Sequence, residues 1–135
     1  MLFKTNMEKK LAIKPHVTRG EEVIKILESL GGVNADEHKG NLPIEWKSAY
    51  YIYGDNTIQF GRDEYLLKLN FVIFTLEEFL ERFPYKVGDE FGYAYDKITE
   101  MFWDEEDEIV YYKTEYSRDY VTTTDIMLDS YARIK

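Results

Sequence analysis

The sequence predicts an α+β protein: an N-terminal helix, a β-hairpin and a further strand, a second short helix, and then a small, strongly bent antiparallel sheet or SH3-like barrel. Three observations predict this class. Apolar residues recur at helical spacing in two short segments. Polar and apolar residues alternate beside a Gly-Asp-Asn turn, and several strand-like segments follow one another closely after residue 84. A chain of 135 residues fits one ordinary domain of ~100–150 residues.

The composition excludes several classes of protein. Hydrophobic residues make up 44% of the chain and charged residues 32%, which is typical of a globular domain. The absence of Cys excludes a disulfide scaffold, a thiolate nucleophile and a thiolate metal site. No apolar run approaches the ~20 residues that span a bilayer, and the N-terminus is too mixed for a secretory signal. We therefore expect a cytoplasmic protein that does not bind membranes.

The first elements are a short strand and a helix. Residues 1–17 contain one apolar cluster, Leu11-Ala12-Ile13, and we expect a strand or an ordered arm there. Thr18 precedes Glu21 at the spacing of a capping box, in which each side chain satisfies a free amide at a helix start. An apolar stripe follows, and Gly31-Gly32 ends it as a C-cap. The pattern predicts a helix over residues 19–30.

A hairpin, a strand and a second helix are expected next. Residues 49–53 and 57–60 flank the turn residues Gly54-Asp55-Asn56, which indicates a β-hairpin. Residues 65–74 suit a further strand. Thr75 and Glu78 have capping-box spacing before a short helix, and Pro84 stops it because the residue before a proline disfavours helical geometry.

The last part, residues 84–135, reads as a small all-β unit. Short strand-like segments are joined by tight turns, which is typical of a bent sheet or SH3-like barrel. The closing residues 125–134 fit either a short helix or an edge strand. The connection between the parts 1–83 and 84–135, at Phe83–Tyr85, is short and aromatic, which favours one compact body.

The charge is polarised along the chain. The formal net charge is −9, and residues 84–135 hold 13 acidic against 6 basic residues, whereas the N-terminal arm is basic. An acidic surface repels phosphate backbones, so we expect no direct binding of nucleic acid by the second part.

Metal sites and catalytic groups are weakly indicated. The consecutive loop residues Asp36-Glu37-His38 point in different directions, and the run 104–108 lacks the glycine and the alternating spacing of a calcium loop. No serine lies in a G-x-S-x-G turn, and Gly31-Gly32 ends a helix where a phosphate loop would open one. We therefore assign no metal, no cofactor and no catalytic residue, and expect a non-enzymatic protein. A small enzyme or ligand-binding domain, with a site of scattered carboxylates and tyrosines, is the alternative.

The acidic, Tyr-rich segment in the second part is the predicted partner-binding surface, because aromatic residues edged with acids are common in protein interfaces. With Glu115 and Asp119 it could also form a stripe that imitates the charge of a DNA duplex and inhibits a host nucleic-acid-handling or defence complex. Alternatively, the Tyr-rich face is buried in a homo-oligomer. The predicted contact residues are Glu100, Asp104, Glu105, Glu106, Asp107, Glu108, Tyr111 and Tyr112.

Three segments carry a resemblance to a known group. Residues 20–34 (GEEVIKILESLGGVN), residues 50–52 (YYI) and residues 75–89 (TLEEFLERFPYKVGD) resemble a family of small uncharacterised phage and mobile-element proteins. Those proteins place a T-L-E-E-F-L helix before P-Y-x-V-G-D and a compact β segment. The resemblance covers about residues 20–115 and involves structural motifs. It implies a mobile-element origin, action by binding host proteins, and no active site.

Overall fold

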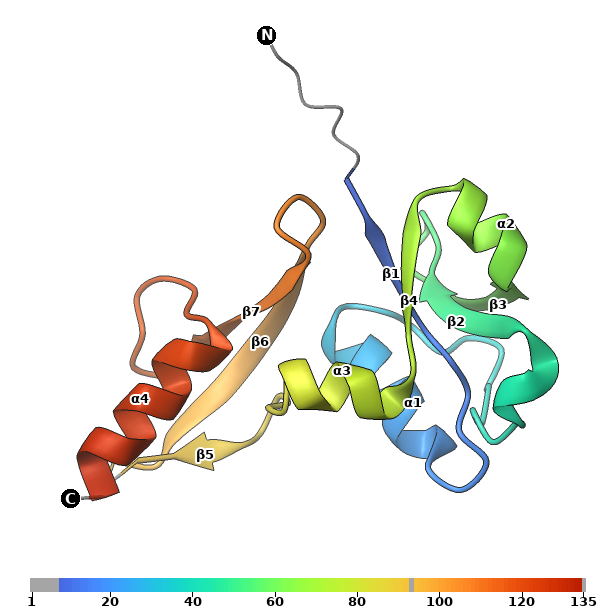
Figure 1. The fold of residues 1–135 in the computed structure, drawn as a ribbon. Coiled ribbons are helices and arrows are strands. Elements are labelled where there is room, and N and C mark those ends of the chain that lie inside the picture. Colours follow the sequence, from blue (N-terminus) through green and yellow to red (C-terminus); the bar gives the residue numbers. More distant parts are fainter. Residues whose placement is uncertain (1–7, 93, 135) are drawn as a thin grey trace, which may run out of the picture.

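The computed structural model describes residues 8–92 and 94–134, with side chains as far as Leu128. It confirms the α+β class: helices accompany a four-stranded and a three-stranded sheet (Figure 1). In chain order the elements are β1 (Lys10–Ile13), α1 (Gly20–Ser29), the 3₁₀ helix η1 (Ile44–Trp46), β2 (Ser48–Ile52), β3 (Ile58–Arg62), α2 (Asp63–Lys68), β4 (Phe71–Phe74), α3 (Leu76–Arg82), β5 (Glu90–Phe91), β6 (Asp96–Asp104), β7 (Ile109–Thr114) and α4 (Thr123–Ile134).

The first sheet has the order β3-β2-β1-β4, so the first strand of the chain lies inside it. β1 pairs antiparallel with β2 and parallel with β4, and Ala12 is the register partner of both Tyr51 and Ile73. Leu11, Ala12 and Ile13 are all buried, because an interior strand is covered on both faces. Within the segment 1–17, where a strand or an arm was expected, residues 10–13 form a central strand, and residues 1–7 lie outside the described part of the chain.

Helix α1 is confirmed, but its predicted cap is wrong. Its end has the expected geometry: Gly31 has φ 104° and donates to the Glu28 carbonyl. At its start, however, the N-cap residue is Arg19, and no side chain caps the helix from that position. His16 Nδ1 instead accepts the backbone N–H groups of Thr18 and Arg19 at 3.2 and 3.0 Å. The imidazole thus binds the two amides just before the helix, and the expected capping box at Thr18 is not formed.

Two glycines fix the long loop that follows α1. A Cβ atom added to Gly20 would lie 2.1 Å from the carbonyl carbon of Gly40, a distance that no side chain tolerates. Gly40 has φ 78° and accepts the backbone N–H of His16 at 3.0 Å. The loop is therefore packed backbone to backbone against the start of α1.

The hairpin β2–β3 and helix α3 are confirmed. Tyr51 and Gln59 are register partners, and Asn56 supplies the positive φ of the turn (70°). In α3, Thr75 Oγ1 accepts the N–H of Glu78, and the Glu78 carboxylate accepts the N–H of Thr75, at 3.1 and 2.8 Å. Both elements were predictable because local contacts specify them.

The continuous strand predicted over residues 65–74 is wrong. Residues 63–68 form α2, Asn70 turns the chain with φ 64°, and only residues 71–74 form β4. Leu66 of α2 is fully buried in a small cluster with Ala12, Ala49 and Phe71. The helix covers the second face of the first sheet, so tertiary burial has overridden the strand propensity of this segment.

The second sheet has the order β5-β6-β7 and is antiparallel throughout, so of the two predicted forms it is the sheet and not the closed SH3-like barrel. Beyond β7, Val121 forms a single bridge with Tyr112. The closing segment is the helix α4, one of the two expected forms, and buried Ile126 belongs to it.

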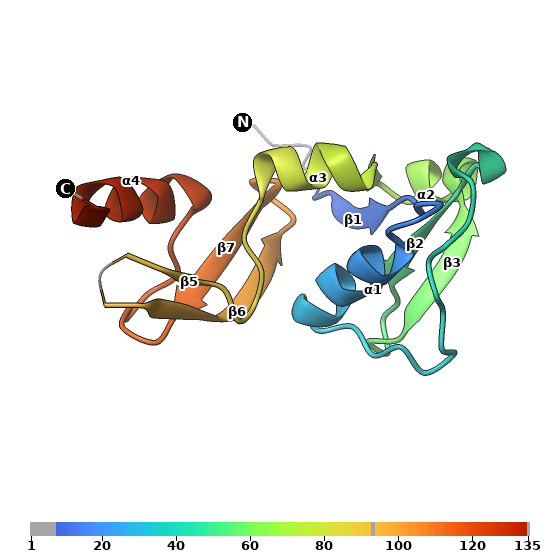
Figure 2. The same ribbon diagram turned by 90° about the horizontal axis from the view of Figure 1, so that it is seen from below.

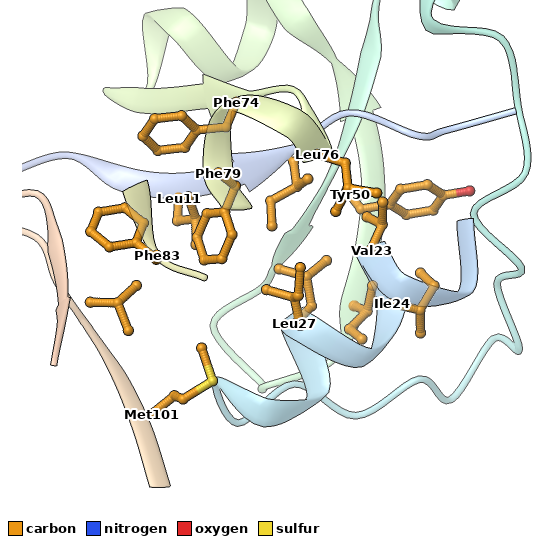
Figure 3. Close-up of a cluster of buried hydrophobic side chains, with 14 of the residues drawn as sticks. Leu11, Val23, Ile24, Leu27, Tyr50, Phe74, Leu76, Phe79, Phe83 and Met101 are labelled. Carbon is orange, nitrogen blue, oxygen red and sulfur yellow. The ribbon is translucent and has the colours of Figure 1, made fainter. Parts of the chain in front are cut away.

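One apolar cluster includes residues of both sheets. Figure 3 shows Met101 of β6 extending into the cluster that includes Leu27 of α1 and Phe79 of α3, together with Phe83, which follows α3. Figures 1 and 2 show α3 between the first sheet and the β5–β7 sheet. The Trp103 ring lies 6.0 Å from Phe83, centroid to centroid. The core thus holds the second sheet in a defined place.

Candidate functional site

The hairpin β6–β7 has an inner and an outer side. A register shift between Ile98 and Glu100 inserts one extra residue into β6, so that Ile98 and Met101 both face inward and are buried. Beyond the shift, Glu100 lies opposite Lys113 and Phe102 lies opposite Tyr111. We call the set Glu100, Phe102, Tyr111, Lys113 and Tyr120 the outer face.

Two aromatic rings dominate the outer face. Phe102 is 50% exposed and Tyr120 is 45% exposed, although both are large apolar rings. Their centroids lie 5.9 Å apart, and the Lys113 ammonium lies 5.8 Å from the centroid of Tyr120. One aromatic face therefore already accommodates a cation.

Carboxylates surround these rings. Glu100 accepts a hydrogen bond from the Tyr120 hydroxyl, and Asp107 accepts one from Tyr111, each at 3.3 Å. Desolvation, this hydrogen bond and the nearby carboxylate charges raise the pKa of Tyr111. The hydroxyl of Tyr111 therefore stays a hydrogen-bond donor to Asp107 at neutral pH.

The run Asp104–Glu108, which we call the acidic turn, connects the two strands. Asp104 Oδ1 accepts the N–H groups of Glu106 and Asp107 at 2.9 and 3.3 Å, so this carboxylate shapes the turn. Glu108 has φ 56° and donates its N–H to the Asp104 carbonyl at 2.8 Å. None of the ion pairs among the described residues includes Glu100, Glu105, Asp107 or Glu108. Their charges are available to a partner.

The structure places most of the predicted contact residues on one surface and shows that one of them is not on the surface. Tyr112 is fully buried, with 0% exposure, because it points inward beside Met101. It cannot contact a partner. The sequence prediction also missed Phe102, Lys113 and Tyr120. Alternation along β6 could have indicated Phe102, whereas Tyr120 follows an irregular loop and reaches the face only through the tertiary fold.

A groove adjoins the outer face between the two sheets. Its volume is about 310 Å³, at the lower end of ligand-binding clefts. Phe102 and Glu105 belong both to this groove and to the surface described above, so the two are continuous. The other lining residues come from the first sheet and its β2–β3 turn, from α1 and the residue after it, and from β6: Lys10, Leu11, Leu27, Leu30, Ile52, Tyr53, Gly54, Asn56, Phe71 and Trp103.

A second constellation superficially resembles a catalytic triad. Glu77 lies 2.8 Å from His16 Nε2, and the Thr18 hydroxyl lies 3.4 Å from His16 Nδ1. However, Nδ1 already accepts two backbone N–H groups, so Nε2 carries the ring hydrogen and donates it to Glu77. The imidazole therefore has no free lone pair with which to act as a general base on Thr18.

The loop Asp36-Glu37-His38 is organised by hydrogen bonds. His38 donates its backbone N–H to Asn34 Oδ1 and accepts from Asn34 Nδ2, both at 2.9 Å. Over residues 8–92 and 94–134, no three His, Asp or Glu side chains are grouped to hold a metal ion. In the same ranges no helix has the length and apolar character needed to cross a membrane. Comparisons with family models, curated proteins and solved structures gave no match.

Proposed function

We propose that the protein is a non-enzymatic accessory protein of phage or mobile-element type, acting in the host cytoplasm, that binds a partner protein through the outer face and the acidic turn. The observation that carries the proposal is the half-exposed pair Phe102–Tyr120, with carboxylates nearby. Four of these carboxylates are in none of the ion pairs among the described residues: Glu100, Glu105, Asp107 and Glu108. Aromatic anchors with a polar rim are typical of energetically important interface centres.

The chemistry of this surface favours a basic partner segment. The acidic turn concentrates five carboxylates, and the chain has a net charge of −9. A partner's Lys or Arg can lie against the Tyr120 ring, as Lys113 already does at 5.8 Å. Complementary charges accelerate association and select the partner, whereas the aromatic contacts slow dissociation.

Inhibition of a nucleic-acid-handling or defence complex is one form of this proposal. A basic cleft that normally holds DNA offers the charges that the acidic turn and Glu100 would contact. Imitation of a duplex requires charge spread along a surface. Glu115 and Asp119 are both exposed and follow β7 in the chain, so they could extend the acidic area beyond the turn.

The test is affinity capture from host lysate, with and without infection. A triple reversal of Glu105, Glu106 and Asp107 to Lys leaves Asp104 to shape the turn. The matched control reverses Glu21, Glu28 and Glu81, which are exposed acids on helices α1 and α3, and changes the net charge equally. We expect the turn variant to lose the captured protein and the control to retain it. Equal capture by both variants would refute the acidic-turn proposal.

The aromatic pair is tested separately. Phe102→Ala with Tyr120→Ala should weaken capture at all salt concentrations, whereas the effect of the charge reversal should diminish as salt rises.

The second candidate function, a ligand-binding domain, is favoured by the groove of about 310 Å³. This candidate predicts that Leu30→Trp, which places a larger side chain in the groove, abolishes the binding of a small ligand there. Capture of the partner protein should persist in the same variant.

A further inference from the structure

A small cavity lies between the β5–β7 sheet and the start of α4. Figure 2 shows α4 along one side of that sheet. The cavity has a volume of about 220 Å³, which is below the range of about 300–1,000 Å³ typical of clefts for drug-sized ligands. Its lining includes the aromatic residues Phe91 and Tyr116 and the acidic residues Asp96 and Asp125. We call this space the α4 cavity, and its size suits a single functional group on a short stem.

Asp96, the first residue of β6, is a buried acid. Among the described residues, Lys14 and Asp96 are the buried charged side chains, at 7% and 5% exposure. The Lys14 ammonium lies 2.6 Å from a carboxylate oxygen of Asp63, so this buried charge is neutralised. Asp96 is in none of the ion pairs among the described residues. Because a buried charge is costly unless an opposite charge pairs with it, a cation in the α4 cavity would stabilise the protein.

The Asp96 carboxylate is held in one orientation and has free acceptor sites. Its Oδ1 accepts the backbone N–H of Tyr116 at 3.1 Å, and its Oδ2 accepts the hydroxyl hydrogen of Thr114 at 2.8 Å. Both donors are neutral, so neither cancels the negative charge. A carboxylate has about four lone-pair sites, and these two bonds leave about half of them free. The carboxylate is thus oriented in advance for a further, positively charged donor.

The lining favours an organic ammonium group over a metal ion. Over residues 8–92 and 94–134, no three His, Asp or Glu side chains are grouped to hold a metal ion, whereas Ca²⁺ takes about 6–8 oxygen ligands. Phe91 and Tyr116 offer aromatic rings, and the face of such a ring attracts an ammonium group. Asp125 adds a second negative charge to the lining. A primary ammonium has three N–H donors, which match the free acceptor sites of the carboxylates.

We propose that the α4 cavity binds a primary ammonium group. The ammonium donates hydrogen bonds to Asp96, and its alkyl stem lies against Phe91 and Tyr116. A free alkylamine and the lysine side chain of a bound protein both carry this chemistry. The site is separate from the proposed partner surface. Asp96 begins β6, whereas the acidic turn starts at the last residue of that strand, Asp104, roughly 25 Å away along the strand.

A titration of the full chain followed by NMR tests the site. The probes are n-butylammonium, a lysine tripeptide with both ends blocked and, as the neutral control, n-butanol, which has the same alkyl stem. The amide of Tyr116 reports binding, because it donates to Asp96. We expect both ammonium probes to shift this amide saturably, with a dissociation constant on the order of 1–10 mM, and butanol to leave it unchanged. Tighter binding of the tripeptide identifies a protein lysine as the source of the ammonium, and tighter binding of butylammonium identifies a free amine.

Two variants separate the charge of the site from the fold. Asp96→Asn keeps an oxygen that accepts the Tyr116 amide but removes the charge. It should raise the dissociation constant about ten-fold or more, the change expected when a hydrogen bond to a charged group is lost. Asp119→Asn is the matched control, because Asp119 is an exposed acid outside the lining of the α4 cavity, and it should leave the constant unchanged.

The second variant, Tyr116→Leu, keeps the test open if Asp96→Asn does not fold. The Tyr116 side chain is 62% exposed, so its replacement leaves the core intact. Loss of the aromatic ring should weaken the binding of butylammonium. Three results would each overturn the proposal: no saturable binding of either ammonium probe to the wild-type chain, equal binding of butanol, or unchanged affinity in the folded Asp96→Asn variant.

Discussion

The indole Nε1 of Trp103 donates a hydrogen bond to the backbone carbonyl of Lys9, at 2.8 Å and across 94 residues of sequence. The Lys9 N–H in turn donates to the carbonyl of Glu105 at 2.9 Å. Both backbone groups of the residue before β1 are therefore bonded to the end of β6 and the residue that follows it. This pair of bonds fixes the acidic turn relative to the first sheet.

Removing the indole donor should destabilise the fold. Trp103→Phe retains an aromatic ring near Phe74 and Phe83 but leaves the Lys9 carbonyl without its donor, which costs about 1–3 kcal/mol. Urea denaturation measures the loss. Lys9→Ala is the matched control, because it keeps the carbonyl, and it should change the free energy of unfolding by less than about 0.5 kcal/mol. Equal losses would show that the hydrogen bond is not the cause.

Two substitutions before helix α1 distinguish between two hypotheses about how its start is stabilised. His16→Ala removes the acceptor of the Thr18 and Arg19 N–H groups and should lower the free energy of unfolding by about 1 kcal/mol. Thr18→Ala would be equally damaging if the predicted capping box existed. In the observed geometry it should have an effect within about 0.5 kcal/mol. Thermal denaturation of the two variants side by side decides between the caps.

The acidic turn contains one strained position. Glu108 has φ 56°, a left-handed conformation that costs a residue with a Cβ atom about 1–2 kcal/mol. Glu108→Gly should raise the free energy of unfolding by about 0.5–1 kcal/mol after the extra chain entropy of glycine is included. Glu106→Gly removes the same charge at a residue without positive φ. This control substitution should lower the free energy of unfolding. A stabilising Glu106→Gly would mean that charge repulsion, not backbone strain, dominates this turn.

The buried Tyr112 makes stability fall at alkaline pH. Burial raises its pKa to about 12, and its hydroxyl lacks a well-formed hydrogen bond. Below pH 10 the tyrosine is protonated in both states. Between pH 10 and 12 only the unfolded chain releases the proton, so the unfolded state gains roughly 2 kcal/mol. Tyr112→Phe should remove this part of the loss and leave stability at pH 7 within about 1 kcal/mol. An unchanged alkaline slope would contradict the assignment.

Local patterns predicted the parts of the fold that local contacts specify. Thr75 and Glu78 form the expected capping box, and Gly31 ends α1 as expected. The same reasoning failed for α2, because burial of Leu66 against Ala12 depends on a strand about fifty residues earlier. It also placed a capping box at Thr18, where the amides of residues 18 and 19 are instead bonded to the imidazole of His16 from the preceding loop.

The candidate site was predictable in composition more than in geometry. The acidic run is visible in the sequence and forms a turn. The assignment of both Tyr111 and Tyr112 to the surface failed because neighbouring residues of a strand face opposite sides of the sheet, and Tyr112 is paired with the inward-facing Met101. Tyr120 could not be placed at all, since its contact with Phe102 crosses an irregular loop.

The interior position of β1 has a consequence for synthesis. Leu11, Ala12 and Ile13 leave the ribosome well before their partner strands, one of which ends at Ile52 and the other at Phe74. Until both have emerged, an apolar strand with open edges is available for pairing with other chains. The yield of folded protein should therefore depend on translation speed and chaperone supply more than on the stability of the finished molecule.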